Sequence, residues 1–240
     1  MPEVVDLAAE LPVGSHTLSL HASNREAKQH AVSFLAGTPP GQAASYWIGD
    51  GDQLPDYRAQ LTAEAPEHVG CVAVLPHEQV TEQPDGHLRP AGEIQEFLHA
   101  HPEGISAGGD TLSLYWTDRT IPAHLEYEAW LSGQPYDRSR LLCPYDLRRV
   151  PPSEAPRVLR ELGAHHSHVV LSGSGQPAVR LLQLFVFPDA ARMPSALRET
   201  LDWGLKTGLV RLDATGRDLS LTTAGEEIVA EWSQQTTVDW

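Results

Sequence analysis

Residues 140–171 have the sequence RLLCPYDLRRVPPSEAPRVLRELGAHHSHVVL, which predicts a strand, a helix and a second strand. The apolar run at 140–143 is typical of a strand buried on both faces of a sheet, and the residues after it become polar and charged. Ser153 is the expected N-cap of the helix and Gly163 its expected end. Residues 168–171 predict the returning strand. This order indicates two parallel strands joined by a crossover helix.

Three polar side chains directly follow the first of these strands. In an open α/β sheet, ligands bind in the crevice outside the carboxyl ends of the strands. Tyr145, Asp146 and Arg148 are therefore candidate ligand-binding residues. Arg148 offers a planar fork of donors and Asp146 an acceptor for a polar ligand. The same two side chains would equally well form an internal ion pair that fixes the strand end, and the sequence leaves both interpretations open.

Strands and helices alternate along the whole N-terminal part of the chain. Ser23 and Glu26 form a capping box that opens the first helix. The other expected strands are residues 15–21, 46–48, 70–75 and 110–116, and the other expected helices are residues 54–63, 92–100 and 121–131. Repeated units of this length predict right-handed crossovers and an α/β fold, with a mainly parallel sheet and helices on both faces.

The sequence SGSGQP at residues 172–177 separates this part from a second one. A run rich in glycine and serine is typical of a flexible linker, so we expect an α/β domain at 1–173 and a small domain at 177–240. The small domain is expected to contain helices at 178–187 and within 194–208, a hairpin within 209–221, and a last helix that begins at 223. This order of elements is that of a winged helix.

The composition is that of an ordinary globular protein. Of its 240 residues, 41% are hydrophobic and 20% charged, and no apolar run approaches the roughly 18 to 20 residues of a membrane span. The N-terminal segment lacks the basic and apolar regions of a signal peptide, so we expect a cytoplasmic protein with no membrane association. Cys71 and Cys143 lie in apolar runs, which favours reduced, buried thiols over a disulfide, a metal site or a nucleophile.

The formal net charge of -15 argues against strong attraction to nucleic acid or to an anionic membrane surface. The C-terminal part is not basic either, because residues 185–240 contain five Lys and Arg against nine Asp and Glu. Arg198, Lys206 and Arg217 are nevertheless the candidate residues for contacts with DNA phosphates. Weak DNA binding and a protein contact are equally consistent with this composition.

The stretch GTPPGQAAS at residues 37–45 superficially resembles a phosphate-binding loop. Such a loop requires G-x-x-x-x-G-K-[ST] between a strand and a helix, so that backbone N–H groups and the lysine hold the phosphates. Here the order is helix then strand, Gln42 replaces the second glycine, and no lysine follows. We interpret the stretch as a turn and expect no cofactor.

Metal ligation and acid–base catalysis have weaker support. His166 and His168 would share one face of a strand, but no Cys, Asp or Glu clusters beside them in the sequence, so no metal site is predicted. Glu126 and Glu128 lie two residues apart on a helix and point in different directions, which makes them poor catalytic partners. Glu126 and His16 remain candidate ligand-binding residues, and no catalytic residue is assigned.

Three segments carry a resemblance to a known family. They are LLCPYDLRR at 141–149, LEYEAWL at 125–131 and GSHTLSLH at 14–21. Together they resemble the MEDS sensory domain, named after methanogen and methylotroph proteins and the DcmR regulator. That family shows a Cys-x-Tyr-Asp-Leu-Arg-Arg strand end, a Glu-Tyr-Glu helix before it and a histidine in the first strand. The resemblance covers about residues 10–173.

The resemblance implies a RecA-like or clock-ATPase-like α/β fold that has lost its P-loop and serves as a sensory or ligand-binding module. The chain departs from the family at Leu20 and His21, where an aromatic residue is usual, and at 116–118, where a Gly-Glu pair is usual. The stretch at 208–232 resembles the wing and last helix of winged-helix regulators.

These observations favour a non-enzymatic sensory or regulatory protein acting in transcription regulation. Its α/β module would bind a small ligand or a protein partner, and its winged helix would contact DNA or another protein. The alternative is an interaction scaffold with no small ligand and no DNA binding. The sequence is compatible with a homodimer and identifies neither the ligand nor the operator.

Overall fold

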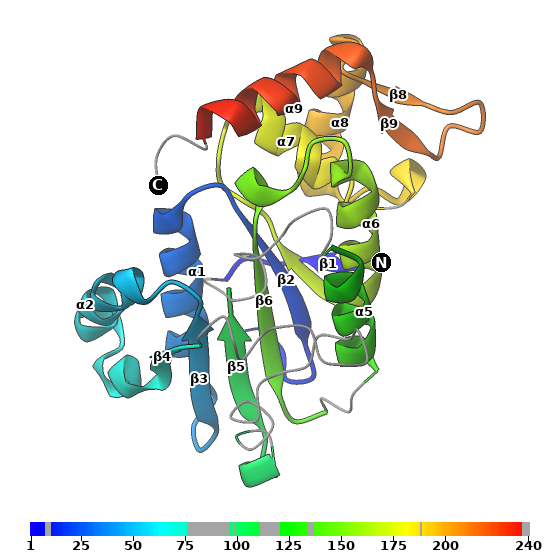
Figure 1. The fold of residues 1–240 in the computed structure, drawn as a ribbon. Helices are drawn as coiled ribbons and strands as arrows, with labels where there is room; N and C mark the ends of the chain where they lie inside the picture. The colour runs from blue at the N-terminus through cyan, green and yellow to red at the C-terminus, as the bar shows by residue number, and fades with distance from the viewer. Residues whose placement is uncertain are drawn as a thin grey trace.

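The computed structural model describes residues 1–7, 11–75, 97, 99–110, 121–133, 137–187 and 189–236. Within these ranges the chain forms a seven-stranded sheet in the order β1-β7-β2-β6-β5-β3-β4, and every neighbouring pair of strands is parallel. Helices cover both faces of the sheet (Figure 1). The predicted class, a mainly parallel sheet with helices on both faces, is confirmed.

The strands of the sheet are short, and the helices beside it make roughly three turns each. The strands are β1 (Glu3–Val4), β2 (His16–His21), β3 (Ala43–Ile48), β4 (Val72–Val74), β5 (Ile105–Gly109), β6 (Arg140–Asp146) and β7 (His168–Val170). The helices are α1 (Asn24–Ala36), α2 (Leu54–Glu64), α5 (Ile121–Ser132) and α6 (Ala155–His165), with 3-10 turns η1 (Gly51–Gln53), η2 (Pro66–Cys71) and η4 (Leu147–Arg149).

The strands β2 and β6 form the centre of the sheet. Their register pairs His16 with Leu141 and His21 with Asp146, so the two strands end side by side. The chain leaves β2 through α1 toward β3, and it leaves β6 through η4 and α6 toward β7 on the other side of β2. The two connections therefore diverge at the carboxyl ends of β2 and β6, which is where open α/β sheets bind ligands.

Apolar side chains fill both faces of the sheet. On one face, α1 and α2 bury Phe34, Leu35, Tyr57 and Leu61 in one cluster with Tyr46 of β3. The helices α5 and α6 contribute to the clusters on the opposite face. Because burying one such side chain contributes about 1.5 to 3 kcal/mol, these layers fix the position of every strand end.

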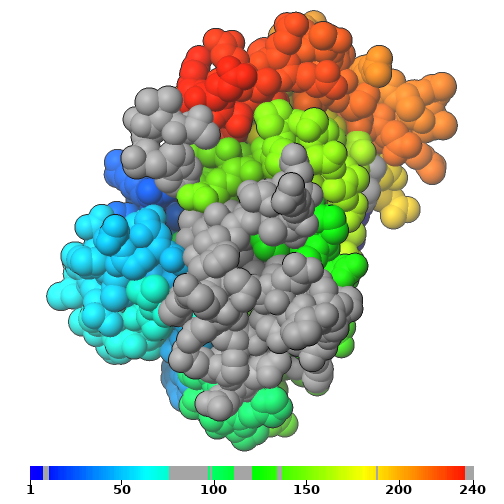
Figure 2. Space-filling model, in the orientation of Figure 1, coloured from blue at the N-terminus to red at the C-terminus, as the bar shows by residue number. Residues whose placement is uncertain are grey.

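The C-terminal elements lie beyond the carboxyl ends of β2 and β6, at the upper end of the molecule in Figure 1. In the space-filling view, the same residues form one end of the face shown and adjoin residues of α6 (Figure 2). These elements are α7 (Pro177–Leu184), η5 (Ala190–Arg192), α8 (Ser195–Lys206), β8 (Val210–Leu212), β9 (Leu219–Leu221) and α9 (Thr223–Thr236). The strands β8 and β9 form an antiparallel pair.

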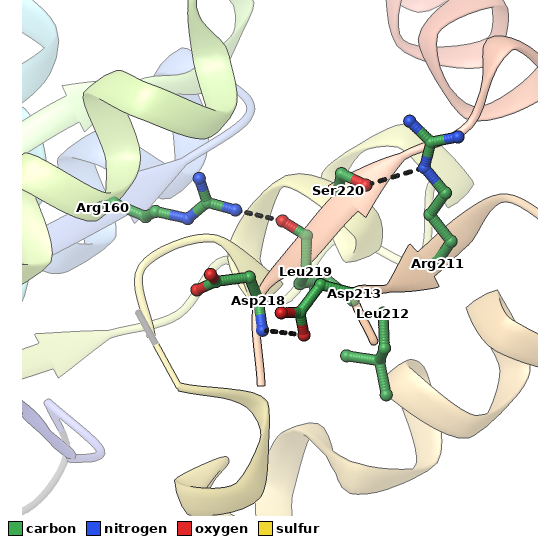
Figure 3. A pocket seen from close by; sticks show the side chains of 7 residues that line it. All are labelled: Arg160, Arg211, Leu212, Asp213, Asp218, Leu219 and Ser220. Carbon is green, nitrogen blue, oxygen red and sulfur yellow. Dashed lines mark hydrogen bonds between the residues drawn. The ribbon is translucent and has the colours of Figure 1, made fainter. Parts of the chain in front are cut away.

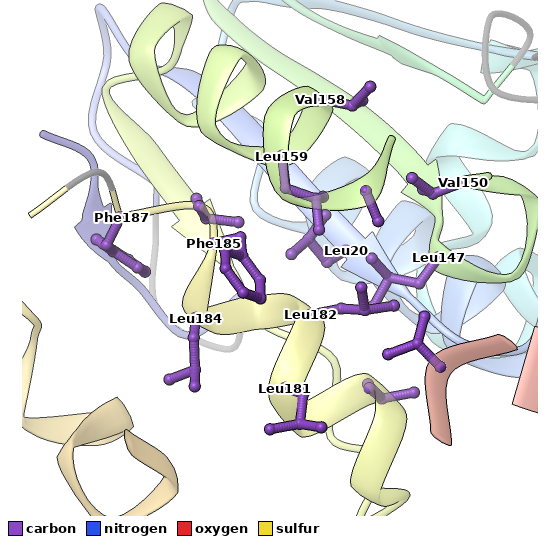
Figure 4. Packing of buried hydrophobic residues seen from close by; sticks show 14 of the residues in the cluster. Leu20, Leu147, Val150, Val158, Leu159, Leu181, Leu182, Leu184, Phe185 and Phe187 are labelled. Atoms are coloured by element: carbon purple, nitrogen blue, oxygen red, sulfur yellow. The ribbon is translucent and has the colours of Figure 1, made fainter. Parts of the chain in front are cut away.

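One buried cluster joins these C-terminal elements to the sheet (Figure 4). It includes Leu20 of β2, Leu147 and Val150 after β6, and Leu182 and Phe185 from α7 and its end. In addition, α7 packs against α6, and α9 packs against η4. The C-terminal elements therefore share their hydrophobic core with the sheet.

The linker between the two parts is anchored by Glu26 in the first turn of α1. The Glu26 carboxylate accepts hydrogen bonds from the hydroxyl of Ser172, at 2.8 Å, and from the backbone N–H of Gly173. Gln183 of α7 donates its side-chain amide to the carbonyl of Ser172 at 3.2 Å. These contacts hold a segment that its composition alone marks as flexible.

The strand β6 is longer than the sequence predicts. It continues through Pro144 to Asp146, although proline cannot donate to a sheet ladder. The neighbouring β5 pairs with β6 only as far as Leu142, so Pro144 lies beyond that ladder. The expectation that the strand ends at Cys143 is therefore wrong.

The expected end of the helix α6 is also corrected. The helix α6 begins at Ala155 and passes through Gly163, which the sequence marked as its end. A Cβ at this glycine would lie 2.0 Å from the carbonyl oxygen of Val186, so Gly163 allows close packing rather than ending the helix. The structure also contains the strand β5 (Ile105–Gly109), which the sequence did not predict.

Some predictions fall outside the described residues. These are the polar connection at 76–90, most of the expected helix at 92–100, the expected strand beyond Asp110, and residues 116–118. Among the helices that the structure does describe, none is long and apolar enough to cross a membrane.

Candidate functional site

A polar network occupies the carboxyl ends of β2 and β6. The Arg148 guanidinium donates from Nε to both carboxylate oxygens of Asp146, at 2.8 and 3.1 Å, and from a terminal nitrogen at 2.6 Å. The same terminal nitrogen donates to the Asn24 side chain at the start of α1, also at 2.6 Å. Asp146 and Arg148 are both buried. The network therefore joins the end of β6 to the first turn of α1.

The N-terminus of α1 carries its own acceptors. The Ser23 hydroxyl accepts from the backbone N–H of Glu26 at 3.2 Å, and the Glu26 carboxylate accepts from the backbone N–H of Ala22 at 2.9 Å. In phosphate-binding folds, such N–H groups and the positive end of the helix dipole are available to the ligand. Here a carboxylate stands at that end, which disfavours a bound phosphate by charge repulsion.

His21 ends β2 beside this network and is buried. Burial lowers the pKa of His21 to about 4, although the nearby Asp146 carboxylate opposes this shift. His21 is therefore neutral at pH 7 and adds no positive charge to the strand ends. A second buried acid, Asp110, follows β5 and accepts from the backbone N–H of Gly49 at 3.0 Å. Burial raises the pKa of Asp110 to about 6.

A second polar cluster lies inside the fold, between β2, β6, α5 and the end of α6. The nitrogen Nε2 of His16 lies 3.3 Å from Oε2 of Glu128 and 3.2 Å from Sγ of Cys143. The nitrogen Nε2 of His166 lies 3.5 Å from the same Glu128 oxygen. The Tyr145 hydroxyl donates to the other Glu128 oxygen, Oε1. Each of four residues offers one atom that can bind a metal, and these four atoms lie within 4.8 Å of one another. The residues are His16, Glu128, Cys143 and His166.

Both imidazoles of this cluster are held from behind by the backbone. Nδ1 of His16 lies 3.0 Å from the carbonyl oxygen of His165, and Nδ1 of His166 lies 2.7 Å from that of Leu162. A carbonyl oxygen can only accept, so each Nδ1 carries a proton, and in a neutral ring Nε2 presents the lone pair. The two rings lie against each other, with centroids 4.1 Å apart. Both Nε2 atoms face Oε2 of Glu128, as hydrogen-bond donors when the ring is protonated and as metal ligands when it is neutral.

Burial controls the protonation of this cluster. It lowers the pKa of His166 to about 3 and raises the pKa of the Cys143 thiol well above its ordinary value. Burial also disfavours an ionised Glu128, but the neighbouring imidazoles of His166 and His16 and the Tyr145 hydroxyl outweigh it and lower the pKa of Glu128 to about 2. At neutral pH the cluster thus holds a buried carboxylate.

The structure divides the residues that the sequence marked for ligand binding. Asp146 and Arg148 stand at the strand ends, whereas Tyr145 and His16 belong to the internal cluster. Glu126 is exposed on α5, and its neighbour Glu128, which the sequence analysis set aside, is the fully buried one. The packing of α5 on the sheet brings Glu128 and His16 together. Their spacing along the chain gives no sign of this contact.

The three candidate DNA-contact residues are all exposed. Arg198 and Lys206 lie on α8, and Arg217 lies in the turn between β8 and β9. The Asp213 carboxylate organises this turn by accepting from the hydroxyl of Thr215 and the backbone N–H of Arg217, which lowers the pKa of Asp213 to about 2. The basic side chains of this region therefore alternate with acidic ones.

A shallow pocket separates this hairpin from α6 (Figure 3). Arg160 of α6 donates across it to the carbonyl of Leu219 and lies over the Phe185 ring, 5.4 Å from its centre. The other lining residues come from the hairpin: Arg211, Leu212, Asp213, Asp218 and Ser220. With two acids and two bases, this pocket shows no preference for a charged ligand.

Comparisons with known proteins identify no family for this chain. No protein-family model matches the chain, and no curated protein is significantly similar to it. A similar solved structure is titled "Structural study of Project ID PH0250 from Pyrococcus horikoshii OT3". It is 8% identical, with a TM-score of 0.47 over 69% of this chain and 85% of that one.

Proposed function

We propose that this chain is a non-enzymatic sensory or regulatory protein. Its parallel α/β part, which resembles a MEDS domain of the RecA-like type without a P-loop, binds a small ligand or a protein partner at the carboxyl ends of β2 and β6. Its C-terminal elements act as a winged helix that transmits the bound state to DNA or to another protein, and so serve transcription regulation.

The observation that carries this proposal is the position of η4. This single turn holds Arg148, which bonds to Asp146 and Asn24 at the strand ends, and it also packs against α9. A ligand that competes for the Arg148 guanidinium would shift η4, and α9 would respond. An equilibrium moves only as far as the ligand prefers one of the two arrangements, so this contact gives the coupling a physical basis.

The absence of enzymatic activity rests on the same edge of the sheet. In the described residues, the connection from β2 to α1 contains no glycine or lysine, and Glu26 places a carboxylate at the helix N-terminus. A triphosphate needs backbone N–H groups and a cation at this position. The site is therefore better suited to a ligand without phosphates, or to a protein segment, than to ATP.

The output surface includes Arg198 and Lys206 on α8 and Arg217 in the hairpin turn. Acidic residues flank these bases, so contacts with DNA phosphates would be few and sensitive to salt. A protein–protein scaffold is the second candidate function. The internal bonds of Asp146 and Arg148 favour it, because they leave the two side chains satisfied with no ligand.

The first test is a thermal-unfolding screen of the purified chain with Mg·ATP, Mg·ADP and a panel of metabolites that lack phosphates. A sensor is stabilised by its ligand, because binding only the native state raises the midpoint of unfolding. We expect a rise with a compound of the panel that is lost in Arg148→Met and kept in Arg157→Met, the latter a change at an exposed arginine of α6. Hydrogen exchange of α9 should change with the same compound. Turnover of ATP that disappears in Asp146→Asn would refute the non-enzymatic function, and a screen with no stabilising compound would favour the scaffold.

DNA binding is tested by a mobility shift at low salt with fragments of genomic DNA. We expect a shift with the native chain that is weakened by Arg198→Glu and Lys206→Glu, both of which are exposed changes. Arg157→Glu on α6 is the matched control. No shift with the native chain would assign the C-terminal elements to a protein contact.

A further inference from the structure

We propose that His16, Glu128, Cys143 and His166 form a buried tetrahedral site for a zinc-type divalent metal ion. The ligand atoms are Nε2 of both histidines, Oε2 of Glu128 and Sγ of Cys143. This site is independent of the crevice at the strand ends, and it does not rest on the sensory function proposed above.

Three of the six separations between these atoms match the edges of a coordination tetrahedron. Zinc binds nitrogen and oxygen at about 2.0 to 2.1 Å and sulfur at about 2.3 Å, which places neighbouring ligand atoms roughly 3.3 to 3.6 Å apart. The His16–Glu128, His166–Glu128 and His16–Cys143 distances are 3.3, 3.5 and 3.2 Å. All four atoms lie within 4.8 Å of one another, so side-chain adjustments that shorten the remaining separations would centre an ion among them.

Two of the four ligand atoms lack another role. Oε2 of Glu128 and Nε2 of His166 are buried and have no hydrogen-bond partner among the described residues. A buried polar atom without a partner destabilises the fold by about 1 to 3 kcal/mol. Both atoms point to the same position, and a metal ion there would satisfy them together.

The surroundings already orient the ligands. Each histidine directs its Nδ1 at a backbone carbonyl, which fixes the tautomer whose Nε2 lone pair is directed at the proposed ion. Tyr145 holds Oε1 of Glu128 and so turns Oε2 toward the imidazoles. Second-layer contacts of this type accompany nearly all metal-binding histidines.

The charges also balance. As a metal ligand Glu128 would be a carboxylate, and metal binding would release the Cys143 proton to solvent and leave a thiolate. These two negative charges cancel the double positive charge of the ion. The loaded site would therefore be neutral in an interior where an uncompensated charge is strongly disfavoured.

Nitrogen and sulfur ligands select zinc over magnesium or calcium, which prefer oxygen. Four protein ligands would leave no open position for a substrate, so the ion would be structural rather than catalytic. It would connect β2, α5, β6 and the residue that follows α6. The ion would thus fix α5 and α6 to the centre of the sheet.

The test uses the full chain, purified without added metal or chelator, followed by elemental analysis. We expect one zinc per chain in the native protein and in Cys71→Ser, and loss of zinc in Cys143→Ser and His166→Gln. Cys71 is the matched control, because it is the other cysteine of the sequence and lies at the end of η2. Removing zinc should lower the unfolding midpoint, and adding it back at 100 to 1,000 times its Kd should restore about 5 to 15 °C.

Cobalt substitution provides a readout that does not depend on any variant folding. Titrating the metal-depleted native chain with Co²⁺ should give the visible bands of tetrahedral cobalt and a near-ultraviolet band from thiolate charge transfer. Tyr145→Phe should keep this spectrum while weakening affinity by about 10- to 100-fold, as expected for a positioning residue. The proposal is overturned if the native chain binds zinc below one equivalent and leaves Co²⁺ with the spectrum of the hydrated ion. Stoichiometric zinc in both Cys143→Ser and His166→Gln would overturn it as well.

Discussion

The Asp146–Arg148 pair allows a direct choice between a structural ion pair and an accessible ligand site. Replacing Arg148 with Met keeps an unbranched apolar stem but removes the three N–H···O contacts to Asp146, at 2.6, 2.8 and 3.1 Å, and the contact to Asn24. Asp146 is only 3% exposed, so its carboxylate would stay buried. Removing one partner of a buried pair destabilises a protein by about 3 to 5 kcal/mol.

Two remaining contacts place the expected loss at the lower end of this range. Asp146 would still accept from the backbone N–H of residue 148 at 3.0 Å, and the Arg149 guanidinium lies 3.7 Å away. We therefore expect Arg148→Met to lower the free energy of unfolding by about 3 kcal/mol. In the double variant Arg148→Met with Asp146→Asn, the loss of unfolding free energy should be smaller than the sum of the two single losses by about 1 kcal/mol or more.

The assay is urea unfolding followed by circular dichroism and tryptophan fluorescence, with Arg157→Met as the control. Arg157 is an exposed arginine paired with Glu154 and Glu161, so its loss should change the free energy of unfolding by about 0.5 kcal/mol or less. If Arg148→Met lowers stability by under about 1 kcal/mol, the pair is not a structural element of the strand end. The reasoning from burial would then be wrong.

Three further changes test other parts of the fold. Burial lowers the pKa of His21 to about 4, so between pH 6.5 and 4 the unfolded chain binds more protons than the folded one. The free energy of unfolding should therefore fall as the pH drops through this window. In a series of urea titrations, His21→Gln should remove about 3 kcal/mol of that fall. Gly163→Ala should destabilise by about 1 to 3 kcal/mol, because its Cβ would meet the Val186 carbonyl, whereas Gly175→Ala meets nothing within 4 Å and should be neutral in the same titration. Glu26→Ala should destabilise by about 2 kcal/mol and increase hydrogen exchange of the linker amides, and unchanged exchange would contradict the anchoring role of this carboxylate.

The sequence was sufficient for the sheet class because its strands and helices alternate with clear periodicity. It failed at β5, whose sequence ISAGG has two glycines and little apolar pattern. These glycines let β5 lie close to its neighbours, because a Cβ at Gly108 or Gly109 would press on β6 or β3. Pro144 misled in the opposite direction, since proline interrupts a strand only where a ladder needs its N–H.

The internal cluster could not be found by spacing. Its member His16 lies more than 100 residues before each of the others, Glu128, Cys143 and His166, and the parallel register of β2 and β6 brings His16 near Cys143. The burial of Glu128 depends on which face α5 turns to the sheet. The sequence shows that Glu126 and Glu128 point in different directions, but not which of the two is buried. The strand ends were easier to predict, because the carboxyl edge of a parallel sheet follows from topology alone.

The strand order also sets the order in which the parts of the sheet can form. The central strand β2 pairs with β6 and β7, which follow it by more than 100 residues. Of these two partners, β6 is the first to be synthesised. During synthesis, His16–His21 must therefore wait until residues 140–170 have emerged from the ribosome before its ladders close. Contacts between such distant residues slow folding and keep apolar strands exposed. The stretch with the clearest secondary-structure pattern is thus also the one whose arrival completes the sheet.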